Sequence, residues 1–139
     1  MKKIAIINGP NLNLTGIREP EVYGSTTMEQ MVDQLRQSFP NVEISYFQSN
    51  IEGELIDRLH TVGFTADGII VNAGGYCHTS VALHDAIAAI KAPVVEVHLS
   101  NIFAREDYRH HSLLSSACRG FICGFGLEGY AMALSSLTA

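Results

Sequence analysis

The feature that most limits the possible folds is a repeated alternation of short apolar runs with segments of helical periodicity. The strand-length apolar runs cover residues 3–8, 42–47, 68–72, 93–98 and 120–124. Apolar residues at helical spacing cover residues 28–39, 51–62, 81–90 and 127–137. The central runs lack the polar alternation of a half-exposed sheet, which indicates a parallel sheet covered on both faces. For 139 residues, this pattern predicts one α/β domain with a flavodoxin-like, doubly wound, five-stranded parallel sheet.

Local signals set the expected helix boundaries. Two capping boxes, Thr26-x-x-Glu29 and Ser49-x-x-Glu52, predict the starts of the first two helices. Thr79 or Ser80 is expected to cap the Ala-rich third helix, whose small residues favour close packing or a subunit contact. Pro40 and Gly63 are expected to end the first and second helices.

Composition excludes several classes of protein. The chain is 47% apolar with a net charge of -5, so it can form a core and has no basic stripe for nucleic acid. No apolar run approaches the ~20 residues of a membrane helix, and the first strand is too short for a signal-peptide core. Three cysteines without Cys-x-x-Cys spacing favour a reducing cytoplasm. No zinc-binding spacing is present, so no metal site is expected.

Polar or glycine-rich residues follow four of the predicted strands. They are Asn8-Gly-Pro-Asn11, Gln48-Ser-Asn50, Asn72-Ala-Gly-Gly75 and His98-Leu-Ser-Asn101. Ligands of open parallel sheets bind beyond the carboxyl ends of the strands. Because no Asp or Glu stands at these ends, we expect an uncharged or anionic ligand and no magnesium ion.

The segment 9–24 has no periodicity and is unusually long for a structureless connection, so we interpret it as a lid. It carries Arg18 and Tyr23. A nearby guanidinium favours a phenolate over a phenol, which would make Tyr23 a general base. Solvation of the Arg and packing of the Tyr remain the alternative.

A second candidate cluster follows the fourth strand. Glu96 and His98 are two residues apart and share a face of the strand, where a carboxylate would orient the ring and hold its proton. That arrangement suits a general acid, although a hydrogen-bonded core histidine is the alternative. Arg105 and Arg109 would share a face if the stretch were helical, and either is a candidate carboxylate clamp. Glu106 and Asp107 are equally plausible partners for both.

The third cluster, residues 72–80, places two glycines before a helix, a geometry that suits anions or hydroxyl groups. No Gly-x-Gly-x-x-Gly follows the first strand, and no Gly-x-x-x-x-Gly-Lys-Ser/Thr is present. The lysines, Lys2, Lys3 and Lys91, do not stand at a strand carboxyl end, so Schiff-base chemistry has no candidate. A nicotinamide cofactor and the usual nucleotide-binding loop are therefore not expected.

Nine blocks of residues in order along the chain resemble the type II 3-dehydroquinate dehydratases. They are Asn8-Gly-Pro-Asn-Leu-Asn-Leu14, Arg18-Glu-Pro20, Tyr23-Gly-Ser-Thr-Thr27, Gln48-Ser-Asn50, Glu52-Gly-Glu54, His78-Thr-Ser-Val-Ala-Leu83, Val95-Glu-Val-His-Leu-Ser-Asn101, Ala104-Arg-Glu106 and Arg109-His-His-Ser112. The resemblance implies a flavodoxin-like fold, no cofactor, and a dodecamer built from trimers. It also implies the reversible dehydration of 3-dehydroquinate to 3-dehydroshikimate in the shikimate pathway of aromatic amino-acid biosynthesis.

The resemblance also implies roles for individual residues. Tyr23 matches the base that removes the proton alpha to the ketone, and Arg18 matches the residue that polarises it. His98 matches the acid that protonates the leaving hydroxyl, and Glu96 matches its partner. Asn11 matches the residue that holds a water near the enolate oxygen.

Six further positions match residues that bind substrate in the family. They are Asn72, His78, Asp85, Leu99, Ser100 and Arg109. Of these, Asp85 matches a residue that reaches the site of a neighbouring subunit. Thr15 and Phe103 depart from the commonest family pattern, where an apolar residue and a histidine are usual. The departures concern the lid and the packing around Arg105.

Two other classes compete with this interpretation. Gly75-x-Cys77 beside His78 faintly resembles the nucleophile elbow of an amidotransferase-like hydrolase, although Thr79 replaces the second glycine. A non-catalytic receiver-type signalling domain has the same fold. It would need acidic residues where Asn8 and Asn72 stand.

Overall fold

The computed structural model describes residues 1–17 and 20–139, without the side chains of Val22 and Tyr23. One all-parallel sheet has the strand order β2-β1-β3-β4-β5. The strands are β1 (Lys2–Asn8), β2 (Val42–Gln48), β3 (Gly68–Asn72), β4 (Val94–His98) and β5 (Gly120–Cys123). This topology confirms the expected doubly wound, flavodoxin-like α/β fold.

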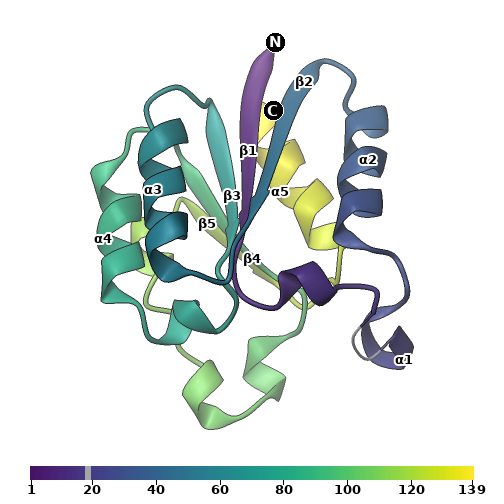
Figure 1. Cartoon of the computed structure of the whole chain (residues 1–139), viewed down its shortest axis with the longest axis vertical. Helices are drawn as coiled ribbons and strands as arrows, with labels where there is room; N and C mark the ends of the chain where they lie inside the picture. Colours follow the sequence, from purple (N-terminus) through teal and green to yellow (C-terminus); the bar gives the residue numbers. More distant parts are fainter. Residues whose placement is uncertain (18–19) are drawn as a thin grey trace.

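Helices cover both faces of the sheet (Figure 1). The helices α2 (Met28–Ser38) and α5 (Glu128–Thr138) pack on one face, and α3 (Glu52–Val62) and α4 (Val81–Ala89) pack on the other. Strand β1 shows why both faces must be covered. Its Ile4 and Ile6 are buried in the core with α2 and α5, whereas Ala5 and Ile7 are buried in the core with α3 and α4. Alternate residues of the strand point to opposite faces, so an apolar run serves two cores.

The helix boundaries agree closely with the predictions, but two of the caps differ. Helix α2 begins one residue later than predicted, with a capping box formed by Thr27 and Gln30. Helix α3 has Ile51 as its N-cap residue and no side-chain cap. The hydroxyl of Ser49 instead accepts from the Ile51 N–H and donates to Glu54. Ser80, the expected alternative to Thr79, caps α4 by accepting from Leu83 N–H at 2.9 Å.

The segment 9–24 is not structureless as predicted. It contains the 3-10 helix η1 (Leu12–Leu14) and the short helix α1 (Pro20–Tyr23). Neither has apolar residues at a repeating interval, so periodicity could not reveal them. The described residues also form the 3-10 helices η2 (Gly74–His78), η3 (Ile102–Ala104), η4 (Asp107–Arg109) and η5 (Ser115–Ala117).

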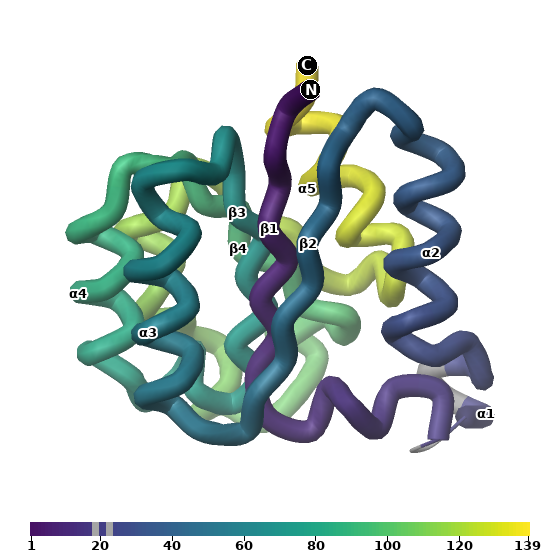
Figure 2. Tube along the Cα trace, turned by 45° about the horizontal axis from the view of Figure 1, so that its top comes forward, coloured from purple at the N-terminus to yellow at the C-terminus, as the bar shows by residue number. Residues whose placement is uncertain are grey.

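The strand order places a topological switch at β1, which lies between β2 and β3. Asn8 and Asn72, the last residues of β1 and β3, lie opposite each other in register. Connections leave this edge in different directions, which opens a crevice for a ligand. The two termini lie close together at the opposite end of the sheet (Figure 2). Among the described helices, none is both long and apolar enough to cross a membrane.

Candidate active site

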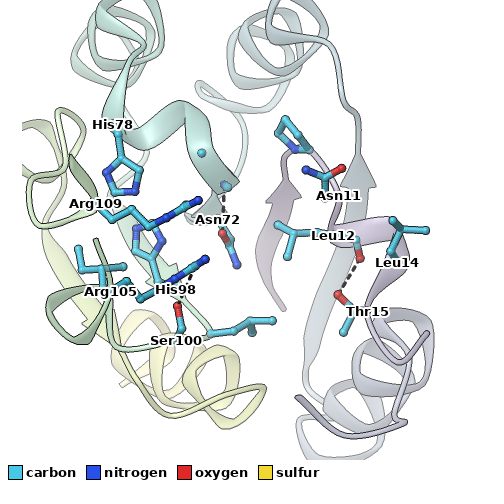
Figure 3. Close-up of a pocket in the computed structure, with 15 residues that line it drawn as sticks. Asn11, Leu12, Leu14, Thr15, Asn72, His78, His98, Ser100, Arg105 and Arg109 are labelled. Carbon is cyan, nitrogen blue, oxygen red and sulfur yellow. Dashed lines mark hydrogen bonds between the residues drawn. The ribbon is translucent and has the colours of Figure 1, made fainter. Parts of the chain in front are cut away.

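A cavity of about 250 Å³ opens at the carboxyl edge of the sheet (Figure 3). Segments that follow β1, β3 and β4 supply its walls. The lining residues are Pro10, Asn11, Leu12, Leu14, Thr15, Asn72, Gly74, Gly75, His78, His98, Leu99, Ser100, Ile102, Arg105 and Arg109. The cavity therefore brings together Asn11, Asn72, His78, His98, Leu99, Ser100 and Arg109, all predicted from the sequence. Their joint placement is what the crevice rule for parallel sheets predicts.

The ends of β1 and β3 are in close contact beside the cavity, which Pro10, Asn72 and Gly74 line. The N–H of Gly9 donates to the carbonyl of Asn72 at 2.7 Å. A Cβ on Gly9 would lie only 2.5 Å from the carbonyl oxygen of Ala73, so no larger residue fits there. Gly74 has a φ of +60°, in the left-handed region that glycine adopts without strain. Gly9 thus allows the two strand ends to approach, and Gly74 allows the backbone after β3 to line the cavity.

A neutral hydrogen-bond network holds Asn72 beneath the cavity. Its Nδ2 donates to the hydroxyl of Tyr130 at 3.0 Å, and its Oδ1 accepts from Gly74 N–H at 3.2 Å. The Tyr130 hydroxyl donates in turn to Asn8 Oδ1 at 2.8 Å. Asn8 and Tyr130 are fully buried, so Asn8 belongs to the scaffold and does not reach a ligand. We call Asn8, Asn72 and Tyr130 the amide network.

The predicted pair of Glu96 and His98 is formed at the end of β4. His98 Nε2 lies 2.6 Å from Glu96 Oε2, and both side chains are buried. An ionised carboxylate only accepts hydrogen bonds, so Nε2 carries the hydrogen. The other ring nitrogen, Nδ1, is then left for a ligand in the cavity that His98 lines. The ring also packs against Phe121 on β5, with centroids 5.5 Å apart.

Glu96 remains ionised although it is buried. Burial raises the pKa of its carboxyl, but hydrogen bonds from His98, Ser112 and Ser115 outweigh burial, and the pKa falls below its ordinary value. The hydroxyls of Ser112 and Ser115 lie 2.6 Å and 2.7 Å from Oε2 and Oε1. We call Glu96, His98, Ser112 and Ser115 the carboxylate network.

Two arginines give the cavity a positive wall. Arg105 lies between η3 and η4 and contacts Ser100 Oγ at 3.4 Å, so it does not share a helix with Arg109. Arg109 Nε donates to Glu106 at 2.7 Å, which shows that Glu106 is its partner. Hydrogen bonds from Tyr108 and Arg109 lower the pKa of Glu106 to about 2. Both guanidinium groups line the cavity and suit an anionic ligand.

His78 lies on the η2 side of the cavity and is fixed by the segment after η4. Its Nδ1 donates to the carbonyl of His111 at 2.9 Å. The neighbouring Cys77 thiol lies 3.4 Å from His78 Nε2. Burial and the charge of Glu96 raise the pKa of Cys77 to about 12, so the thiol stays protonated at neutral pH. This opposes the interpretation of Cys77 as a nucleophile.

Among the described residues, one group has the composition of a metal site. Ligand atoms of Cys77, Glu96 and His98 lie within 4.8 Å of one another. The Glu96 oxygens already accept three hydrogen bonds, and a thiol with a pKa of about 12 is a poor ligand. The residues therefore fit the hydrogen-bonded arrangement better than a metal ion.

The first part of the predicted lid forms the opposite wall. Asn11 adopts a φ of 70°, which asparagine tolerates better than most residues, and its N–H donates to Asn50 Oδ1 at 3.0 Å. Gln48 Nε2 supports the same turn by donating to the carbonyl of Gly9 at 3.1 Å. Thr15 donates to the carbonyl of Leu12 at 2.8 Å and so closes η1. Arg18 and the side chain of Tyr23 lie outside the described residues.

Asp85 lies away from the cavity of its own chain. It is on the exposed side of α4, with its side chain 72% exposed and 3.2 Å from His84 Nδ1. Phe103 is 57% exposed and packs its ring beside His110, with centroids 6.1 Å apart. Within the described part of the chain, Asp85 is therefore not among the residues that line the cavity.

Sequence reasoning missed the roles of Ser112, Ser115 and Tyr130. The serines bond Glu96 across 16 and 19 residues of chain, and Tyr130 bonds Asn8 across 122. Isolated serines and a tyrosine within a helix carry no local signal of such a contact. One indirect signal was available, since a buried Glu needs donors and the stretch after Arg109 supplies hydroxyl groups.

The fold and the cavity define a class of protein: a doubly wound α/β domain that carries a histidine–carboxylate pair and two arginines at its strand ends. The profile of the family described as Dehydroquinase class II matches residues 2–138. The 3-dehydroquinate dehydratase of Dinoroseobacter shibae is 55% identical over 139 residues, covering 98% of this chain and 92% of that protein. The chain belongs to this family.

Further relatives agree with that assignment. The 3-dehydroquinate dehydratase of Caldicellulosiruptor bescii is 49% identical, covering 99% of this chain and 97% of that protein. The crystal structure of type II dehydroquinase from Butyrivibrio crossotus superimposes with a TM-score of 0.94 at 42% identity, covering 99% of this chain and 98% of that one. The membership overturns the hydrolase and receiver-domain alternatives.

Proposed function

We propose that this chain catalyses the reversible dehydration of 3-dehydroquinate to 3-dehydroshikimate, as a hydro-lyase of the shikimate pathway. The observation that carries the proposal is the buried Glu96–His98 pair at the edge of a cavity with two arginines, in a chain of the class II dehydroquinase family. Elimination of water next to a ketone needs a base, a stabilised enolate and an acid for the departing hydroxyl.

His98 is the proposed acid. With Nε2 donating to Glu96, its Nδ1 is the ring nitrogen available to a substrate hydroxyl in the cavity. A protonated ring would transfer its Nδ1 proton to the leaving hydroxyl, which departs as water. The ionised Glu96 supports the charged ring during this step.

Tyr23 is the proposed base, and Arg18 is proposed to favour its phenolate form. Support for these two roles comes from the sequence, since guanidinium and phenol lie five residues apart in one segment that resembles the family pattern. The phenolate would remove the proton alpha to the ketone and leave an enolate. Asn11, which lines the cavity, is proposed to hold a water near the enolate oxygen.

The substrate carboxylate needs a cationic or N–H-rich partner. Arg109 is the proposed clamp, because its guanidinium lines the cavity. The hydrogen bond from its Nε to Glu106 holds the side chain in place. Ser100 and the backbone beyond Leu99 lie on the same side and are proposed to complete the carboxylate site. Asn72 and His78 are proposed to contact substrate hydroxyls. The proposed site uses no cofactor and no metal.

The single domain of residues 1–139 is proposed to act with residues 9–24 as its lid, in a cytoplasmic dodecamer built from trimers. The exposed Asp85 is proposed to reach the site of a neighbouring subunit. An apolar groove with the exposed side chains of Val81 and Phe103 supports burial of this face against another chain. Analytical ultracentrifugation tests the assembly, and a fully active monomer would contradict it.

Separating the two proton transfers tests the mechanism. Tyr23→Phe should lower kcat by 10²–10⁴-fold with little change in substrate affinity. His98→Ala should abolish net dehydration while exchange of the alpha proton with deuterated water persists. Enone absorbance follows dehydration, and NMR follows exchange. Exchange retained in Tyr23→Phe but lost in His98→Ala would reverse the two roles, and near-native turnover in both variants would refute the proposed site.

A further inference from the structure

We propose that Ser112 and Ser115 are positioning residues of the acid site, whose hydroxyl groups fix the Glu96 carboxylate behind His98. The inference rests on the proposed role of His98 as the acid. The Ser112 hydroxyl donates to Glu96 Oε2 at 2.6 Å, and the Ser115 hydroxyl donates to Oε1 at 2.7 Å. His98 Nε2 also donates to Oε2, so both carboxylate oxygens accept hydrogen bonds from other side chains.

The hydrogen of Ser112 has a fixed direction. Its Oγ accepts from the N–H of Leu114 at 3.1 Å, so the hydroxyl hydrogen is directed toward Glu96. The serines are also held from outside the network. The Leu113 N–H donates to the carbonyl of Cys77 at 2.7 Å, and Leu114 is fully buried. This anchoring leaves the hydroxyls little freedom to turn away from the carboxylate.

The same segment contacts a second wall of the cavity. The carbonyl of His111 accepts from His78 Nδ1 at 2.9 Å, next to the two serines in sequence. One stretch, residues 111–115, thus fixes both the proposed acid pair and a proposed substrate contact. This stretch therefore contacts both the end of β4 and the turn after β3, and it belongs to neither strand.

The groups that face Glu96 make its ionisation depend on these hydroxyls. They are His98 on β4, Cys77 in η2 and Cys118 after η5, while the charge of Arg109 acts on Cys77. Burial raises the pKa of each thiol to about 12, so both are neutral and give no charge to balance the carboxylate. Within the described residues, the hydrogen bonds that lower the pKa of Glu96 come from His98 and the two hydroxyls.

The test compares Ser112→Ala, Ser115→Ala and the double variant with two controls. Ser116→Ala is the matched control, since Ser116 lies in the same segment and its Oγ contacts His84 Nε2 at 3.3 Å. Ser112→Thr retains the hydroxyl. Each single alanine variant should lower kcat roughly tenfold with KM within about twofold, and the double variant should lower it further. The acid limb of the kcat profile should move to higher pH, because the pKa of Glu96 rises when a donor is lost.

Ser116→Ala should match the parent protein, and Ser112→Thr should restore most of kcat. Unchanged kcat and an unchanged acid limb in both alanine variants, with melting temperatures near the parent value, would overturn the inference. So would loss of activity by a rise in KM alone. Glu96→Gln and His98→Ala in the same series separate the two proposals. If these retain turnover, the proposed acid is wrong; if they lose it while the serine variants do not, only this inference fails.

Discussion

Two buried hydrogen-bond networks lie at the same edge of the sheet, on opposite faces of it. In the amide network, Asn8 and Asn72 project toward the core of α2 and α5, where Tyr130 joins them. In the carboxylate network, Glu96 and His98 project toward the other face, where Ser112 and Ser115 join them. The first consists of neutral groups only, and the second encloses an ionised carboxylate.

The amide network is mainly structural, although its Asn72 lines the cavity, whereas the carboxylate network holds the proposed acid. Burial raises the pKa of Tyr130, so the amide network keeps one protonation state across the physiological range and joins β1, β3 and α5 permanently. The carboxylate network holds a charge whose neighbour, His98, faces the cavity. Changes to the amide network should therefore mainly lower the free energy of unfolding. Changes to the carboxylate network should mainly lower kcat.

The largest expected effect is on catalysis by Glu96→Gln. Gln keeps the shape of the side chain and one oxygen that can accept a hydrogen bond, but the negative charge beside His98 is lost. We expect kcat to fall by roughly 10²-fold or more, with a loss of about 1 kcal/mol in the free energy of unfolding. Steady-state kinetics and urea unfolding measure the two quantities. A variant that loses stability but retains kcat would break the distinction between the networks.

Tyr130→Phe should produce the opposite result. The change removes the hydroxyl that joins Asn72 to Asn8 and leaves buried amide groups without partners. We expect a loss of about 1–3 kcal/mol in the free energy of unfolding, with kcat within about threefold of the parent. Urea unfolding checks the first value. A large fall in kcat at unchanged stability would instead place Tyr130 in the catalytic machinery.

The networks should also respond to opposite extremes of pH. The pKa of Glu96 is lowered in the folded protein, so its contribution is complete above the ordinary value of 4.5 and is lost as the pH falls through the folded value. The pKa of Tyr130 is raised, so its contribution is complete below 10 and is lost as the pH rises. Unfolding free energies across the pH range should thus show a smaller acid-side loss in Glu96→Gln than in the parent. Glu106→Gln is measured for comparison, because the pKa of that exposed carboxyl is also lowered and its protonation contributes to the loss of stability at low pH.

The smallest effect is expected from Cys77→Ser, beside the carboxylate network. No proposed step uses a thiolate, and the raised pKa of Cys77 keeps it protonated. Activity should stay within about threefold of the parent in the dehydration assay, since the hydroxyl keeps a donor near His78 Nε2. Complete loss of turnover, with circular dichroism unchanged, would return Cys77 to consideration as a nucleophile.

Much of the site could be predicted because strand ends are a local property of the sequence. Once the five strands were placed, the crevice rule brought Asn11, Asn72, His98 and Ser100 to one edge. The pairing of Glu96 with His98 followed from the two-residue period of a strand. The caps of α2 and α3 were harder, because Thr26 and Thr27 are chemically alike and Ser49 found another partner.

By itself, the sequence determined the order of strands and helices, the parallel sheet and the edge where chemistry is expected, because apolar periodicity and turn residues act over short stretches of chain. Only the tertiary structure decided which arginine pairs with Glu106, that Asn8 is scaffold, and that Ser112, Ser115 and Tyr130 complete two networks. These contacts join residues far apart in the chain, and a polar side chain has many possible partners until packing leaves it one. The physical reason is that burial, which makes every donor and acceptor need a partner, exists only in the folded molecule.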